Sequence, residues 1–214
     1  MASVGSNTPH RGVGHRRSGR TWRKKDFAML SMKPRPDLPR RIVTGIRDGK
    51  SVILSDGAVP STHRHVATPG LMSAVLWTTA AVPQLSEATH EPAPPAVRTP
   101  PELGGTSLLV VRFPPDAVMA GPRFDFDAAG VEGMQRLPGL AELFEHEQPG
   151  MHSTDFLDYG IVLDGDIWLE LGDGVRTLLT AGDIAVQCGT RHAWCNKSDR
   201  ATTMAFVLIG ARRS

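Results

Sequence analysis

The amino-acid sequence predicts an all-β protein assembled from short antiparallel strands. Glycine and proline account for 22 and 17 of the 214 residues, about 18% against roughly 12% in average proteins, which favours many turns. From residue 155 onward, six short apolar runs fall within about 55 residues, and glycine-containing turns separate most of them. This spacing is typical of a β-sandwich or β-barrel rather than of a helical bundle.

The C-terminal strands follow from the apolar runs that lie between these turns. Turns are expected at 164–166, 172–174 and 181–183, where glycine stands beside aspartate. Ile167, Leu169 and Leu171 recur with a period of two, so they share one face of their strand. The expected strands are 156–163, 167–171, 175–179, 184–186, 192–196 and 202–209.

The N-terminal half carries further strand signals. Short β-branched runs at 42–43 and 52–54 flank an Asp48-Gly49 pair, which predicts a hairpin. Further strands are expected at 71–79 and 106–113, the second ending at Pro114-Pro115. Residues 55–69 have turn composition, and the apolar spacing within 137–146 predicts one short helix.

Four regions result from these signals. Residues 1–40 read as a disordered basic tail, residues 41–113 as N-terminal strands that pack on or complete the barrel, residues 114–148 as a linker with a short helix, and residues 149–212 as the barrel core. Two readings of 41–113 stay open: outer strands of a single barrel, or a degenerate second barrel half. Met29 and Met32 leave a later start of the chain open, and an organelle targeting segment is a further reading of the Arg-rich tail.

Charge divides unevenly between the tail and the body. Residues 1–41 hold 11 of the 24 Lys and Arg but two of the 22 acidic residues, which leaves 13 basic and 20 acidic residues in the body. A basic arm can bind nucleic acid. However, the body is acidic and has no DNA-binding motif, which argues against a sequence-specific DNA-binding protein. No long apolar run resembles a signal peptide or a membrane span, so we expect a cytoplasmic protein that binds no membrane. Cys188 and Cys195 are too few for a disulfide framework.

Two segments of the C-terminal third resemble the two sequence motifs of the cupin superfamily. The first opens at His152, places Asp158 where the family has glutamate, and closes on Gly165. The second reads GDIAVQCGTRHAWCN over 182–196, with Gln187 where the family has proline. The resemblance implies an RmlC-like jelly-roll barrel, a small organic molecule as ligand and a homodimer. In detail the segments are similar to a subgroup of bacterial and fungal single-barrel cupins, some of which resemble proteins of secondary metabolism.

The same residues supply a candidate site. Positions 152, 154 and 158 share strand parity, so His152, Thr154 and Asp158 are expected to point inward, and His192 enters from a neighbouring strand. Two imidazoles and a carboxylate match the ligands of non-haem Fe(II) oxygenases and also accept Zn, Mn or Ni. Thr154 stands where the family has its second motif histidine, and Asp158 is one methylene shorter than glutamate. A metal-free site in which His152 or His192 acts as the general base and Asp158 orients it stays open.

The functional prediction rests on this site. His152, Asp158 and His192 are the candidate catalytic and metal-ligating residues, and Thr154, Gln187 and Trp194 are candidate pocket-lining residues. We expect a cupin enzyme of the lyase, decarboxylase, cyclase or oxygenase type, with a divalent metal or with none. The alternative is a non-catalytic cupin that binds or senses a small ligand. The sequence contains no Walker loop, dinucleotide fingerprint or nucleophile elbow, which argues against nucleotide-dependent chemistry.

Overall fold

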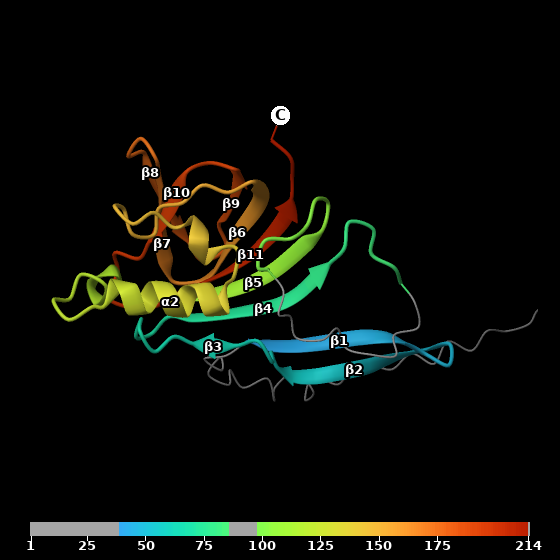
Figure 1. Cartoon of the computed structure of the whole chain (residues 1–214). Helices are drawn as coiled ribbons and strands as arrows, with labels where there is room; N and C mark the ends of the chain where they lie inside the picture. Colours follow the sequence, from blue (N-terminus) through green and yellow to red (C-terminus); the bar gives the residue numbers. More distant parts are fainter. Residues whose placement is uncertain (1–38, 86–97, 214) are drawn as a thin grey trace, which may run out of the picture. The chain divides into compact units, whose positions relative to one another are not determined.

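The computed structural model describes residues 39–85 and 98–213, and the expected tail at 1–40 lies almost wholly outside these ranges. Strands dominate the described residues (Figure 1). They are β1 Arg40–Arg47, β2 Lys50–Ala58, β3 His63–Arg64, β4 Met72–Thr79, β5 Thr106–Phe113, β6 Phe156–Asp164, β7 Asp166–Leu171, β8 Arg176–Thr180, β9 Ile184–Cys188, β10 His192–Cys195 and β11 Thr202–Gly210. The helical elements are α2 Phe126–Arg136 and the short 3-10 turns η1 Asp116–Val118 and η2 Ala141–Leu143.

The all-β prediction is confirmed, and most strand boundaries agree with it. Strand β5 covers the expected residues 106–113, and the six C-terminal strands begin and end within two residues of their expected bounds. The turn at 164–166 shows why glycine is needed there. Gly165 has φ +85°, and a Cβ on it would lie 2.6 Å from Thr202 Oγ1, so a larger residue would strain both the backbone and the packing.

The expected N-terminal hairpin is also confirmed. Strands β1 and β2 pair antiparallel from Arg40–Ala58 to Arg47–Lys50. Asp48 and Gly49 have φ values of 51° and 69°, the left-handed pair of a type I′ turn, whose twist matches the twist of the paired strands. Strand β3 falls in the segment expected to have only turns, so the prediction missed it.

The strands form two larger sheets whose ladders are antiparallel. One sheet has six strands in the order β3-β4-β5-β11-β6-β9, and the other has three in the order β10-β7-β8. Strand β11 pairs with β5 on one side and with β6 on the other. The strands β4 and β5 therefore extend the same sheet that contains the C-terminal strands, as the neighbouring arrows in Figure 1 show.

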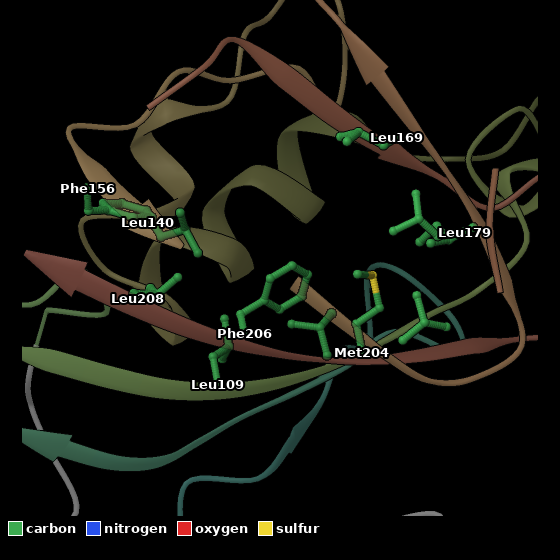
Figure 2. Close-up of a cluster of buried hydrophobic side chains, with 11 residues drawn as sticks. Leu109, Leu140, Phe156, Leu169, Leu179, Met204, Phe206 and Leu208 are labelled. Atoms are coloured by element: carbon green, nitrogen blue, oxygen red, sulfur yellow. The ribbon is translucent and has the colours of Figure 1, made fainter. Parts of the chain in front are cut away.

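The principal hydrophobic core joins the inner faces of these two sheets (Figure 2). Met204 and Phe206 on β11 belong to the same buried cluster as Leu169 on β7 and Leu179 on β8. Ile167 is fully buried and Leu169 nearly so, as their shared parity predicted. A second, smaller cluster of residues with the opposite parity, among them Val110 and Ala205, lies on the other face of the six-stranded sheet.

The helix expected at 137–146 is wrong in position. The helix α2 precedes this segment, and its N-terminus is capped by Asp125, whose side chain accepts a hydrogen bond from Ala128 N at 2.9 Å. It ends before Pro138, which cannot continue the hydrogen-bond ladder, and Gly139 follows with φ +82°. Within 137–146 only η2 is helical, so the apolar spacing there reflects separate contacts rather than one helix face.

Among the described residues, no helix combines the length and apolar character that crossing a membrane requires.

Candidate functional site

His152 and His192 are held beside each other by the main chain. Each residue donates its backbone N–H to the carbonyl of the other, at 2.9 Å in both directions, and the two form an isolated antiparallel bridge. Their ring centroids lie 4.4 Å apart. The structure thus brings together the two histidines that the sequence places 40 positions apart.

The two rings have the same hydrogen-bonding arrangement. His152 Nδ1 lies 3.1 Å from the carbonyl oxygen of Gly150, and His192 Nδ1 lies 2.9 Å from that of Thr190. A carbonyl oxygen only accepts, so each Nδ1 carries the proton. In the neutral ring the lone pair then resides on Nε2, which is the form that binds a metal or accepts a proton.

Burial keeps these rings neutral. It is the main cause that lowers the pKa of His152 to about 4, with a further contribution from His192, while Glu145 and the Gly150 carbonyl oppose the shift. Burial also lowers the pKa of His192, against the hydrogen bond to Thr190. At neutral pH the site therefore presents two uncharged imidazoles.

The segment that precedes His152 is held in place by contacts of Phe144 and Glu145. Arg191, next to His192, donates two hydrogen bonds to Glu145, from Nε at 2.7 Å and from Nη2 at 2.6 Å. Phe144 packs edge-on against the His152 ring, with centroids 4.7 Å apart. Glu145 thus joins this segment to the loop before β10 through an ion pair, and Phe144 contacts the His152 ring itself.

Asp158 lies on β6 with its carboxyl group buried on the inner side of the sheet. Its strand partner on β9 is Gln187, and both residues are 3% exposed. Asp158 Oδ1 and Gln187 Nε2 have no hydrogen-bond partner among the described residues, whereas Gln187 Oε1 accepts from Thr190 Oγ1 at 2.5 Å. Burial raises the pKa of Asp158 to about 7, so its carboxyl group exists in both protonation states near neutral pH.

The structure does not place Asp158 in one ligand cluster with the two histidines. Within the described ranges, a single group of His, Cys, Asp and Glu residues has all its ligand atoms within 4.8 Å of one another, and that group is His63, His65 and Glu132. The metal-ligand role of His152, Asp158 and His192 therefore stays a prediction. The two imidazoles suit a metal ion because the hydrogen-bonded Nδ1 of each ring leaves Nε2 with the lone pair, but among the described residues no group of three ligand atoms within 4.8 Å of one another includes them.

The expected pocket-lining residues have different surroundings. Thr154 is buried, and its hydroxyl donates to the carbonyl of Phe156 at 3.3 Å. Trp194 contacts the edge of His192 at a centroid distance of 5.9 Å and Phe206 at 5.7 Å. Trp194 thus connects the histidine pair to the hydrophobic core, while the Thr154 hydroxyl is engaged by the backbone.

Sequence reasoning missed the cluster of His63, His65 and Glu132. Two histidines separated by one residue share strand parity, which was a usable signal. Glu132 was not recognisable, because it lies 69 positions from His63 and only the tertiary fold brings the two side chains together.

Comparisons with known proteins give partial matches. No family model matches the chain. A 63-residue segment is 49% identical to "Phomopsin biosynthesis cluster protein C'" of Diaporthe leptostromiformis and covers 29% of this chain and 33% of that protein. A 62-residue segment is 37% identical to "Cupin-domain-containing oxidoreductase fogC" of Aspergillus ruber, covering 28% of this chain and 30% of that protein. The matches thus span about a third of the length of these curated relatives.

Among solved structures, a Cupin 2 conserved barrel domain protein from Salinispora arenicola is 18% identical with a TM-score of 0.35, covering 65% of this chain and 75% of that one. The sequence match to a cupin-domain-containing protein agrees with the antiparallel two-sheet fold. Over these segments the chain is similar to cupin-domain proteins, and its antiparallel two-sheet fold is the fold class that the sequence motifs predict.

Proposed function

We propose that this protein is a cupin-fold enzyme of secondary metabolism that acts on a small organic molecule with the His152–His192 pair. The observation that carries the proposal is the matched arrangement of the two rings, in which backbone carbonyls bind both Nδ1 atoms and leave both Nε2 atoms as bases or ligands. The relatives named for a biosynthesis cluster and for an oxidoreductase support the metabolic setting.

The residues suit proton transfer at neutral pH. An acid–base group works best when its pKa lies near the operating pH, and the pKa of Asp158 is raised to about 7. Gln187 presents an amide N–H toward the same buried region and would orient a substrate oxygen. This combination fits a lyase, decarboxylase or cyclase step.

A divalent ion such as Fe, Mn, Ni or Zn would be held by His152 and His192 and would supply Lewis-acid or redox chemistry, as an oxygenase requires. The neutral state of both rings at pH 7 favours such binding because a protonated imidazole has no lone pair to offer.

Elemental analysis of the full chain tests the proposal. Wild type is compared with His152→Ala and His192→Ala, and His146→Gln is the control because His146 is an exposed histidine outside the pair. We expect each alanine variant to hold about one metal ion per chain fewer than wild type, and the control to hold as much as wild type. If no variant differs from wild type in metal content, the same proteins are screened by thermal shift against small aromatic and polyketide-like compounds, and a stabilising compound must lose its effect in both alanine variants. Failure of both measurements would overturn the proposal.

A non-catalytic binding protein is the second candidate. It is favoured because, among the described residues, Asp158 and the two histidines do not form a group with all ligand atoms within 4.8 Å of one another. Mass spectrometry of a compound that stabilises the protein distinguishes the two, since an enzyme converts the compound and a binding protein releases it unchanged.

A further inference from the structure

A second group of metal-ligating side chains lies at the end of β3, where α2 packs. His63 Nε2 is 2.7 Å from Glu132 Oε1, and His65 Nδ1 is 3.9 Å from Glu132 Oε2. The two imidazole rings are 4.9 Å apart in an edge-to-face arrangement. One nitrogen from each histidine and one carboxylate oxygen therefore converge, all within 4.8 Å of one another.

His65 and Glu132 are oriented by partners outside the cluster. Ser73 Oγ on β4 lies 3.0 Å from His65 Nε2, which turns Nδ1 of the same ring toward the carboxylate. Val66 N and Ala67 N donate to Glu132 Oε1 and Oε2 at 2.9 and 2.8 Å, so the carboxylate is fixed by the backbone that follows the histidines. Outer hydrogen bonds of this kind hold ligands in place at metal sites.

The carboxylate is charged, as a metal ligand must be. Against a burial effect that acts in the opposite direction, the hydrogen bonds from His63, Val66 and Ala67 lower the pKa of Glu132 to about 2. Oε2 accepts one backbone hydrogen bond and keeps a second lone pair, whereas Oε1 accepts from both Val66 N and His63 Nε2, so an ion there takes the place of the His63 proton. The anion is therefore available for a cation as well as for the backbone.

Two imidazoles and one carboxylate are the three-ligand set of open zinc sites and of related transition-metal sites. A tetrahedral ion at ordinary bond lengths needs ligand atoms about 3.3 Å apart. The 2.7 Å separation is to Oε1 and the 3.9 Å separation is to Oε2, on either side of this value, so an ion held by all three groups requires side-chain movements on the order of 1 Å.

We propose that His63, His65 and Glu132 bind a divalent transition-metal ion, with Zn²⁺ the best match to the ligand set. The ion joins α2 to the β3–β4 edge of the six-stranded sheet, because Glu132 belongs to the helix and the histidines to the strand end. This site shares no residue with the His152–His192 pair and does not depend on its function. An ion that binds only the folded chain raises its stability by mass action.

The test uses the full chain, stripped with EDTA and then dialysed against Zn²⁺. Metal content is measured by ICP mass spectrometry, and thermal unfolding is followed with and without Zn²⁺. His63→Gln and Glu132→Gln are the test variants, because glutamine retains hydrogen-bonding capacity at both positions. His146→Gln is the control for loss of an exposed histidine, and His192→Ala accounts for metal at the other pair.

We expect both test variants to hold one Zn²⁺ fewer than wild type and to lose the Zn²⁺-dependent rise in Tm. His146→Gln should match wild type in both measurements, and His63→Gln should show the loss in the His192→Ala background as well. Equal zinc content and an equal Tm rise in wild type and both variants would overturn the proposal and leave the cluster as a hydrogen-bonded anchor for α2. If Glu132→Gln does not fold, His63→Gln decides, because the His63 side chain is 21% exposed against 15% for Glu132.

Discussion

Asp158 on β6 and Gln187 on β9 stand directly opposite each other in the sheet, and each buries a polar atom that lacks a hydrogen-bond partner among the described residues. An unpaired buried polar group costs about 1–3 kcal/mol. A bound molecule that donates to Asp158 Oδ1 and accepts from Gln187 Nε2 would recover this cost, so the pair defines the hydrogen-bonding pattern that a ligand must match.

Asp158→Asn is expected to stabilise the metal-free protein at pH 8. The pKa of Asp158 is about 7 in the folded state and 3.8 in the unfolded state, so the unfolded chain loses its proton first as the pH rises. Wild type then loses stability between about pH 4 and 7, by an amount on the order of 4 kcal/mol. Urea unfolding at pH 4.5 and 8 in EDTA should show this loss in wild type and not in the variant. Asp199→Asn changes an exposed carboxylate and should unfold like wild type at both values.

His152→Gln is expected to flatten the acid side of the stability profile. The pKa of His152 is about 4 when folded and 6.5 when unfolded, so the unfolded chain takes up the proton first as the pH falls. Wild type therefore loses on the order of 3 kcal/mol between pH 6.5 and 4 through this group. Urea unfolding across this range should show a shallower decline in His152→Gln, with His146→Gln as the exposed-histidine control. An equally steep decline in the variant would contradict the burial of His152.

Glu145→Gln is expected to lower the pKa of His152 further. The Glu145 charge opposes the effect of burial on this ring, and the substitution removes that charge. An NMR titration of the histidine Cε1–H resonances measures the change. Glu170→Gln is the matched control, because it breaks a similar two-bond pair with Arg176 while Glu170 has no influence on the pKa of His152. Identical His152 titration in wild type and Glu145→Gln would show that the ion pair does not act on the site.

Gly160→Ala is expected to destabilise the fold by about 1–3 kcal/mol. A Cβ at this position would lie 3.0 Å from Trp194 Cζ2 and 3.3 Å from Met204 Cε. Trp194 would have to move, and it contacts His192 directly. Urea unfolding measures the loss, and Gly57→Ala is the strand control because an added Cβ there meets no atom within 4 Å. A Trp194→Phe substitution should relieve part of the loss, and full additivity of the two changes would argue against this contact.

The sequence predicted the strands well because their signals are local. The turn at Asp48-Gly49 requires left-handed backbone at both positions, and the pattern Ile167, Leu169, Leu171 directly marks a buried face. The helix was predicted in the wrong place because the prediction followed the strongest local signal. Its start depends on the Asp125 cap, which is a weaker signal than the apolar spacing of 137–146, and Pro138 with Gly139 ends the helix before that spacing begins.

The candidate site was only partly predictable. Strand parity correctly placed Asp158 among the buried residues, but it carries no information on the distance between Asp158 and the histidines. The pairing of β11 with both β5 and β6, and the approach of Glu132 to His63, depend on contacts between distant parts of the chain. No local pattern records such contacts.

The two reciprocal backbone hydrogen bonds between His152 and His192 set the spacing of these positions independently of their side chains. Main-chain atoms, identical in almost every residue type, set the spacing of these two positions. Exchange of one imidazole for another side chain therefore leaves the opposite ring where it was. Variants at either position can therefore be compared on the same backbone frame.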